Sequence, residues 1–365
     1  MRLQNIPVVK GQSLAAGQRL VVDIPRALYL YGLTFNFRGQ TQVTAIGTTV
    51  LPEDILNFLQ RLQINFTHDI FGSDSPLDVP GPSLFAYREI YSDVPGPGTK
   101  DCSPLISPQV GIYNWLFQVD MQFPPEKIVQ KQLPFYLLDA PRCSLLQAVI
   151  QWGGPNNASF MDGGTYANYA YASAQAGLPT VDIEAIQVLD QVHNPLTAMV
   201  RRQSREIDLS GTPFPVTRDL IAVLPTGESI RSIMLRQYIR DTTAGQPTSA
   251  ALTLLDPINP GVDAGITDIG MRVNTKFIRE WNSFPQLQDQ NSRDYGVQAW
   301  PLSIGVIEFV RNHDIDRVLF TQDFVTRRLQ LDLAGTVVTQ AAGRVELLTT
   351  SIKPNPQLGR TAVKR

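Results

Sequence analysis

Charged residues, cysteine and histidine are all scarce in this 365-residue sequence. Asp, Glu, Lys and Arg together make up 18% of it, whereas an average soluble domain contains about 25%. Hydrophobic residues make up 43%, which is enough to form an ordinary hydrophobic core. The sequence therefore combines a normal hydrophobic content with an unusually low content of charged residues. This combination indicates that neighbouring molecules cover much of the surface. The formal net charge of −2 does not steer the molecule toward nucleic acid, and we predict no specific nucleic-acid recognition.

The two cysteines, Cys102 and Cys143, are too few for a disulfide scaffold and are typical of a chain that folds in a reducing cytoplasm. We expect free thiols, and a single bridge between the two residues remains the alternative. The N-terminus has no uninterrupted apolar segment of the kind found in signal peptides. No run approaches the ~18 apolar residues of a membrane-spanning helix. We therefore expect a chain that is made in the cytoplasm and does not span a membrane.

Motifs for catalysis or cofactor binding are also lacking. The three histidines, His68, His193 and His313, lie far apart and have no metal-ligand spacing. The segment 311–317 around His313 is typical of a charged turn. No nucleophile elbow, phosphate-binding loop or dinucleotide fingerprint occurs. We predict that the protein binds no cofactor or metal ion and is not an enzyme.

One alternative to that prediction is a carbohydrate-active enzyme or binding module on a β-sandwich. Such an enzyme needs two facing carboxylates. Asp120 and Glu308 are the candidates, because they occupy comparable strands of the two halves of the chain. Asp120 falls on the polar side of its strand, where a solvated carboxylate is the ordinary outcome.

Short runs of alternating apolar and polar residues dominate the sequence, and the 27 prolines and 26 glycines cluster between them. In one run Leu33, Phe35 and Phe37 share a face, because side chains alternate across a strand. This pattern predicts an all-β fold. Short helices are expected at 51–56 and 83–91. The predicted strands are 28–38, 61–67, 114–123, 145–152, 181–189, 230–240, 268–278, 302–309, 329–333 and 343–352.

The strand order is repeated within the chain. The strand at 114–123 is followed by one at 145–152, and about two hundred residues later 302–309 is followed by 329–333. Two β-sandwiches in one chain are therefore predicted. The segment with Pro195, Arg201-Arg202, Pro213 and Pro215 is typical of a linker. We predict an N-terminal domain at 1–195, a linker at 196–217, a C-terminal domain at 218–352 and a basic tail at 353–365.

Two kinds of segment are candidates for contacts with other molecules. The long insert at 153–180 carries Tyr166, Tyr169 and Tyr171 among small residues, a composition typical of contact surfaces. It is interpreted as an intersubunit or tower loop, with packing on its own domain as the alternative. Further inserts lie at 241–266 and 283–300. The tail residues are predicted to form either a frayed end or an arm that reaches a neighbouring subunit, nucleic acid or lipid; they are Lys353, Arg360, Lys364 and Arg365.

The chain resembles the double jelly-roll major capsid proteins of tailless icosahedral viruses, a lineage that includes tectivirus-like phages and the adenovirus hexon. The resemblance covers roughly residues 18–352 and rests on the pattern of strands and on the length of the chain. The segments that carry it are 54–64, 115–124, 133–135, 146–150, 304–309, 329–333 and 345–350.

The resemblance implies two consecutive eight-stranded jelly rolls with short helices and long loops. It also implies homotrimers that form pseudo-hexagonal tiles of a virion, synthesised in host cytoplasm, with no catalytic residues. Neighbouring capsomers and minor capsid or vertex proteins would be partners, and an internal membrane could lie beneath. Another jelly-roll virion component, such as a vertex or spike protein, is a further alternative.

Overall fold

A computed structural model describes most of the chain and divides it into two compact units. Unit 1 comprises the described residues of 1–203 and 353–356, and unit 2 those of 204–352. The residues described are 1–15, 17–43, 59–81, 83–84, 87, 90, 111–125, 133–153, 169–171, 179–192, 198–208, 220–224, 228–240, 252–254, 266–274, 276–281, 284–296, 304–309, 319–320, 329–335 and 342–356.

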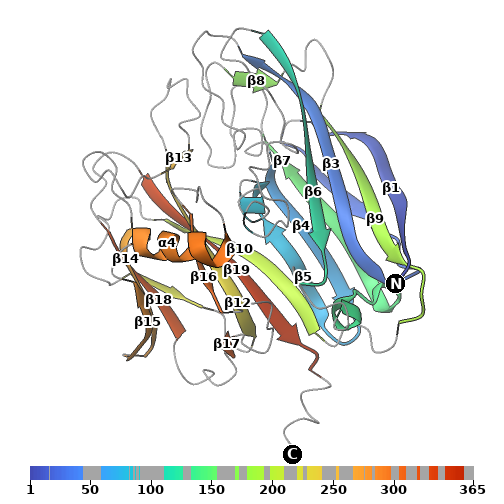
Figure 1. The fold of residues 1–365 in the computed structure, drawn as a ribbon. Helices are drawn as coiled ribbons and strands as arrows, with labels where there is room; N and C mark the ends of the chain where they lie inside the picture. Colours follow the sequence, from blue (N-terminus) through green and yellow to red (C-terminus); the bar gives the residue numbers. More distant parts are fainter. Residues whose placement is uncertain are drawn as a thin grey trace, which may run out of the picture. The chain divides into compact units, whose positions relative to one another are not determined.

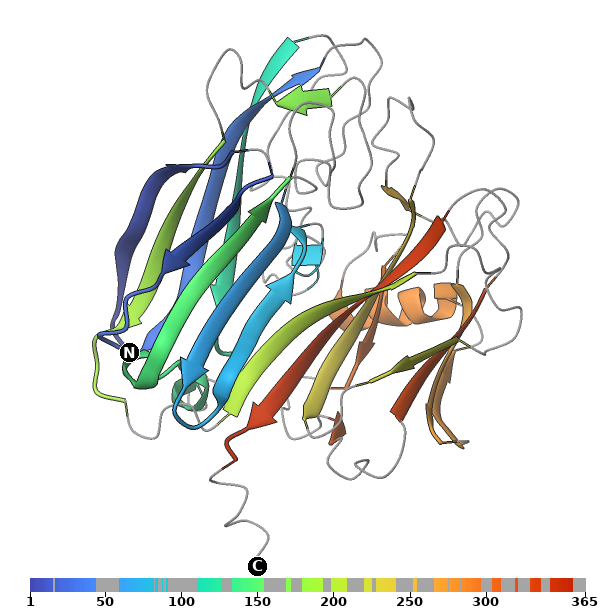
Figure 2. The ribbon, with the colours of Figure 1, turned by 180° about the vertical axis from the view of Figure 1, so that it is seen from behind.

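Unit 1 contains two four-stranded antiparallel sheets, which Figures 1 and 2 show as separate layers. One has the order β1-β9-β3-β6 and the other the order β2-β7-β4-β5. The short strand β8 pairs with the end of β3. The bounds are β1 Leu3–Ser13, β2 Arg19–Asp23, β3 Leu30–Val43, β4 Leu59–His68, β5 Gly72–Val79, β6 Gly111–Gln122, β7 Cys143–Trp152, β8 Tyr169–Tyr171 and β9 Thr180–Val188. With β8 set aside, the strands follow the orders 1-8-3-6 and 2-7-4-5, which is the jelly-roll connection.

Unit 2 repeats this topology. Its sheets have the orders β10-β19-β12-β16 and β11-β18-β14-β15, which are again 1-8-3-6 and 2-7-4-5 when the short strands β13 and β17, both paired with β12, are set aside. The bounds are β10 Ala198–Asp208, β11 Leu220–Val223, β12 Ser229–Arg240, β13 Leu252–Leu254, β14 Ile266–Val273, β15 Lys276–Trp281, β16 Ile304–Glu308, β17 Leu319–Phe320, β18 Leu329–Gly335 and β19 Ala342–Pro354. The pair of strands that recurs in the sequence therefore corresponds to the sixth and seventh strands of each roll, which are β6 and β7 in unit 1 and β16 and β18 in unit 2.

An aromatic stack joins the two sheets of unit 1. Phe37 of β3 stacks on Phe117 of β6, with 4.6 Å between ring centroids, and on Trp152 of β7 at 5.7 Å. Trp115 completes the group at 6.2 Å from Trp152. All four side chains are at most 3% exposed, and rings of this size supply much of the apolar area that a sandwich core buries. Gly39 lies opposite Trp115 in the ladder, and a Cβ at Gly39 would come within 2.3 Å of the indole.

The strand predictions that follow a buried face are confirmed. Strand β3 buries Leu33, Phe35 and Phe37 completely, and β4 does the same with Leu62 and Ile64. The single strand predicted at 268–278 is instead a hairpin of β14 and β15. Its turn is marked by Asn274, whose φ of 56° lies in the left-handed region that asparagine tolerates.

Of the two helix predictions, the one at 83–91 is confirmed and the one at 51–56 stays a prediction. The described residues Gly81, Ser83 and Leu84, with Tyr87 and Ile90 beyond them, are helical. Because Gly81 is already helical, Ser83 lies inside the helix rather than at its cap. The helical turn expected at 51–56 lies outside the described residues. In the part of the chain that the structure describes, no helix has the length and apolarity needed to cross a membrane.

The polar insert predicted at 283–300 contains the helix α4, Phe284–Tyr295. Phe284 and Leu287 enter the core of unit 2. Its buried amides bind the backbone of β16: Gln288 Nε2 donates to Ile304 O at 3.1 Å, and Asn291 both donates to Val306 O at 2.7 Å and accepts from Val306 N at 2.8 Å. The polar composition that suggested a loop thus serves to satisfy a strand's backbone groups.

Replacing Asn291 with Leu is expected to lower the free energy of unfolding of unit 2 by about 2–4 kcal/mol. The substitution leaves the buried N–H and C=O of Val306 without the amide that binds both, and each unsatisfied buried group costs about 1–3 kcal/mol. Chemical denaturation measures the change. Asp289→Leu, at an exposed position of α4 whose ion pair with Arg293 is open to solvent, is the control and should stay within about 0.5 kcal/mol of wild type. Equal effects of the two substitutions would contradict this role of Asn291.

The segment predicted as a linker at 196–217 contains a strand, β10. Met199 and Val200 are buried, and the start of β10 pairs in parallel with β5, with Arg202 opposite Leu77. This strand was not predicted, because its two adjacent arginines interrupt the alternation of apolar and polar residues that indicates a half-buried strand. The unit boundary falls inside β10, between Gln203 and Ser204.

Strand β1 is an edge strand with interruptions. It pairs with β9, and its register shifts between Pro7 and Val9 and again between Val9 and Gln12. Gly11 adopts a φ of 59°. Every residue of β1 is exposed or half-buried, so the strand lacks the alternation of buried and exposed residues from which a strand can be predicted. This strand was accordingly not predicted.

Candidate functional site

The outer face of the sheet β1-β9-β3-β6 is the first candidate for contacts with other molecules. It carries a ladder of uncharged and charged polar groups. Thr34 Oγ1 donates to Asp120 Oδ1 at 2.8 Å, and Gln118 Nε2 donates to both oxygens of Asp120 at 2.8 and 2.9 Å. Farther along, Arg38 forms an ion pair with Asp182. Cross-strand pairs of this kind hold polar side chains in fixed positions.

A hollow of about 530 Å³ opens on this face between β3 and β6. The described residues that line it are Asn36, Arg38, Gly39, Asn114, Trp115 and Leu116. Leu116 is 49% exposed and lies among amide groups, so the hollow offers an apolar spot within a polar rim. Such a surface suits a wet protein contact better than the tight enclosure of a small molecule.

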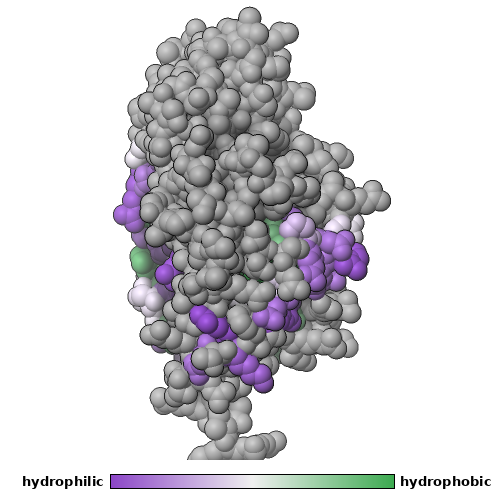
Figure 3. Space-filling view, turned by 90° about the vertical axis from the view of Figure 1, so that its left-hand side faces the viewer, coloured by the Kyte–Doolittle hydropathy of each residue, from purple (hydrophilic) through white to green (hydrophobic). Residues whose placement is uncertain are grey.

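Other exposed apolar side chains are spread over several strands. Ile112 lies on β6, Val21 on β2 and Leu145 on β7. On the face shown in Figure 3, the coloured residues are mainly hydrophilic, with only small hydrophobic areas. The described residues of that face therefore form no large apolar patch.

The tyrosines predicted to make intersubunit contacts lie in part within a strand. Tyr169 and Tyr171 belong to β8, which pairs with β3 at Thr41–Val43, and Tyr166 lies outside the described residues. Part of the insert at 153–180 thus adds a short strand to a sheet of unit 1. Its role in contacts between subunits stays a prediction.

Lys353 was predicted to be part of a basic tail, and the structure corrects this. It belongs to β19, and its Nζ lies 2.6 Å from Asp74 Oδ2. Arg201 of β10 binds the same carboxylate, with Nε 3.2 Å from Oδ1. Asp74 is 7% exposed, Arg201 18% and Lys353 30%. Arg360, Lys364 and Arg365 lie outside the described residues.

Asp74 therefore anchors two passages of the chain at once. Among the described residues, unit 1 ends at Gln203 and resumes at Lys353. Asp74 binds Arg201, just before the first of these boundaries, and Lys353, at the second. The next residue of β10, Arg202, is 3% exposed and lies with its guanidinium 5.7 Å from the ring centroid of Tyr87. Sequence reasoning missed this anchor, because Asp74 stands in the polar run at the start of β5.

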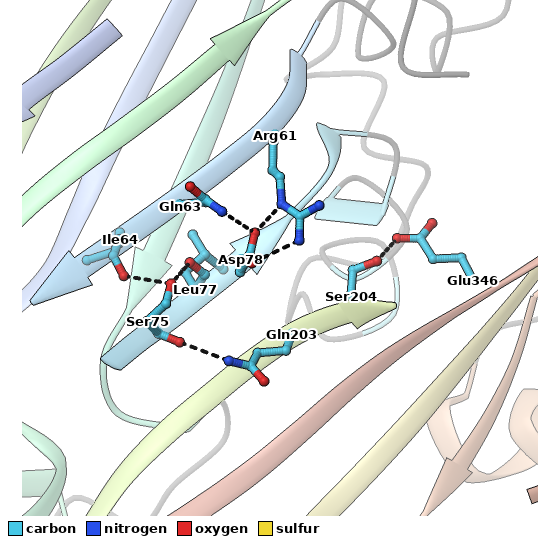
Figure 4. Close-up of polar contacts among 9 residues, drawn as sticks. All are labelled: Arg61, Gln63, Ile64, Ser75, Leu77, Asp78, Gln203, Ser204 and Glu346. Carbon is cyan, nitrogen blue, oxygen red and sulfur yellow. Dashed lines mark hydrogen bonds and ion pairs between the residues drawn. The ribbon is translucent and has the colours of Figure 1, made fainter. Parts of the chain in front are cut away.

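Polar contacts continue along β5 toward β10, as Figure 4 shows. Asp78 pairs with Arg61 and accepts from Gln63 Nε2 at 3.0 Å. Gln203 Nε2 donates to Ser75 O at 3.4 Å. These contacts add to the parallel backbone pairing, and they explain why the start of β10 groups with unit 1.

The carboxylates considered for glycoside hydrolysis are each held within their own unit. Asp120 accepts the bonds from Thr34 and Gln118 described above. Glu308 Oε2 accepts a bond of 2.7 Å from the Tyr295 hydroxyl. Asp120 belongs to unit 1 and Glu308 to unit 2. Within each unit, the described contacts of these carboxylates are with other side chains, and they do not form the facing pair that glycoside hydrolysis needs.

Histidine and cysteine provide no metal site in the described residues. No group of three or more His, Cys, Asp or Glu side chains that could hold a metal ion occurs there. His68 is buried, whereas His193 and His313 lie outside the described residues. Cys143 is a free, buried thiol, as expected. Burial, with Asp139 nearby, raises the pKa of Cys143 to about 12, so this thiol is unreactive at neutral pH. Cys102 lies outside the described residues.

With two jelly rolls of identical strand order, the chain has the double jelly-roll fold of viral major capsid proteins. Its structure is similar to the crystal structure of the STIV major capsid protein, with a TM-score of 0.65 and 12% identity over 99% of both chains. It is also similar to the major capsid protein P2 from bacteriophage PM2, with a TM-score of 0.57 and 10% identity over 96% of this chain and 97% of that one.

A third similar structure is the PBCV-1 virus capsid, with a TM-score of 0.62 and 11% identity over 96% of this chain and 94% of that one. These neighbours are capsid proteins rather than enzymes. No protein-family model matches the sequence, and no curated protein matches it either. At 10–12% identity the likeness is one of fold.

Proposed function

We propose that this chain is the major capsid protein of an icosahedral virus and that three copies form one capsomer. The observation that carries the proposal is the repeated strand order, 1-8-3-6 and 2-7-4-5, in two units that together span the chain. Three such chains present six similar bodies, as a pseudo-hexagonal tile requires. The capsid proteins of similar fold match this chain over nearly its full length, which supports the same use of the fold.

The low charge content supports the proposal from a second side. A chain with 18% charged residues is suited to a shell in which neighbours cover much of its surface. The insert with Tyr166, Tyr169 and Tyr171 is the proposed contact between subunits. The tail with Arg360, Lys364 and Arg365 is proposed to reach a neighbouring capsomer, a minor capsid or vertex protein, or the headgroups of an internal membrane.

We expect the purified full chain to form trimers at micromolar concentration, with three times the chain mass of 40.5 kDa. A lasting trimer needs an interface well above ~2,000 Å². Native mass spectrometry measures the mass, and electron microscopy shows whether the particles are six-lobed. A strictly monomeric chain under these conditions would contradict the proposal. Replacing Tyr166, Tyr169 and Tyr171 by Ser tests the insert separately: if the insert carries the contact, the trimer is lost while the chain stays folded.

A further inference from the structure

We propose that the turn between β4 and β5 in unit 1 is an acid-sensitive element, controlled by the protonation of His68. The turn consists of Asp69, Ile70 and Phe71, between the last residue of β4 and the first of β5. His68 is 2% exposed. The proposal concerns the folded chain itself and does not depend on the capsid proposal.

One hydrogen bond fixes the proton on the imidazole. The backbone N–H of Ile70 donates to His68 Nδ1 at 3.1 Å. A nitrogen that accepts a bond carries no proton, so the neutral ring is protonated at Nε2. Nε2 is buried and has no hydrogen-bond partner among the described residues. The ring is therefore held through its acceptor side alone.

The surroundings of the ring disfavour a charge. The rings of Phe66 and Phe71 lie edge-on to the imidazole, with centroids 6.3 and 5.7 Å away, and keep water from it. Burial lowers the pKa of His68 below its ordinary value, with Arg142 acting in the same direction and Asp69 opposing both. The neutral ring is the form that the folded state prefers at neutral pH.

Asp69 supplies an alternative partner once the ring is charged. Its Oδ1 lies 3.1 Å from His68 Nδ1, while its Oδ2 binds Arg142 at 2.7 Å from Nε. A proton on Nδ1 displaces the Ile70 N–H and turns the contact with Asp69 into an ion pair. The turn then exchanges a bond to its backbone for a bond to its own side chain, and the backbone tie between His68 and Ile70 is lost.

Further titratable groups lie on the neighbouring segment. Cys143 is opposite His68 in the ladder, and its thiol is neutral throughout the relevant pH range because of its raised pKa. Burial raises the pKa of Asp139, so this group stabilises the folded state as pH falls, opposite in sign to His68. A comparison of variants that retain Asp139 and Cys143 removes their contributions.

The direction of the pH effect follows from the lowered pKa. The unfolded chain takes up the proton first, near the ordinary histidine value of about 6.5. Stability is therefore full above that pH and falls as pH drops through it, until the folded form is protonated as well. The ratio of folded to unfolded chain should fall by up to about tenfold per pH unit in this window, the limit for one proton.

The test compares wild type with His68→Asn on the full chain. Asparagine does not titrate, and its side-chain oxygen accepts from the N–H two residues ahead in the same way as Nδ1. Denaturant unfolding between pH 5 and 7 should show an additional loss of stability on acidification in wild type that H68N lacks. Hydrogen exchange at Ile70 should accelerate on acidification in wild type relative to H68N.

Two outcomes would overturn the proposal. One is a parallel pH dependence in wild type and H68N. The other comes from imidazole nitrogen NMR of the wild type, which does not rely on the variant folding. We expect Nε2–H at pH 7 and titration below the ordinary histidine range. A ring already protonated at Nδ1 at pH 7, or one that titrates at the ordinary value, contradicts the mechanism.

Discussion

Replacing Glu346 with Met should lower the free energy of unfolding of unit 2 by about 3–5 kcal/mol, the usual result of removing one partner from a buried ion pair. Glu346 of β19 is 2% exposed, and its Oε2 lies 3.6 Å from Nη1 of Arg236 on β12, which is 1% exposed. Its other oxygen accepts a bond from the Ser204 hydroxyl of β10. One carboxylate thus links three neighbouring strands of the sheet, and its loss leaves a desolvated guanidinium without this counter-charge.

A double substitution distinguishes the loss of the whole ion pair from the loss of one of its partners. Arg236→Met together with Glu346→Met removes both charges, and replacing a whole buried pair by apolar side chains is often neutral. We expect the double variant to recover most of the loss in denaturant unfolding. Asp289→Met, at an exposed position of α4 whose ion pair with Arg293 is open to solvent, is the control. A single variant no less stable than this control would show that Glu346 is not required for the sheet.

Replacing Asp74 with Asn should lower the free energy of unfolding of unit 1 by about 2–3 kcal/mol. The backbone N–H of Ser75 donates to Asp74 Oδ1 at 2.8 Å, and asparagine retains that acceptor, so the substitution isolates the charge. Arg201 and Lys353 are partly exposed and can turn to water, which places the loss below that of a fully buried pair.

Hydrogen exchange gives a local measure of the same anchor. Amides at the start of β10, Val200–Gln203, should lose protection in D74N before the rest of unit 1 does. Asp23→Asn is the control, because Asp23 on β2 is exposed and accepts a bond from Gln147. Unchanged protection at the start of β10 would mean that backbone pairing with β5 holds this strand without the carboxylate.

The strands with one buried face were predictable from the sequence. Phe35, Phe37 and Trp115 alternate with polar residues because the sheet has an inside and an outside. Strands β1, β5 and β10 were not predictable for three different reasons. Strand β1 buries almost nothing, β5 opens on polar residues that include Asp74, and β10 carries Arg201 and Arg202, whose partners are distant in sequence.

The helix α4 was missed because its buried face is partly made of amides. Gln288 and Asn291 read as surface residues, and only the neighbouring backbone of β16 explains their burial. The acid-sensitive turn was not predicted, because the strand expected at 61–67 ended one residue before His68. The alternation of that strand, with Phe66 on its buried face, continues to His68. The candidate contacts at Tyr169 and Tyr171 remain predictions from composition.

The interrupted edge at β1 bears on how copies of the chain meet. Pro7 has no amide hydrogen to offer a further strand, and the two register shifts with the left-handed Gly11 bend the row of backbone groups out of line. An additional strand therefore finds no regular row of backbone groups to pair with, which disfavours edge-to-edge association along β1. A contact between copies at this edge would have to be made by side chains rather than by backbone pairing.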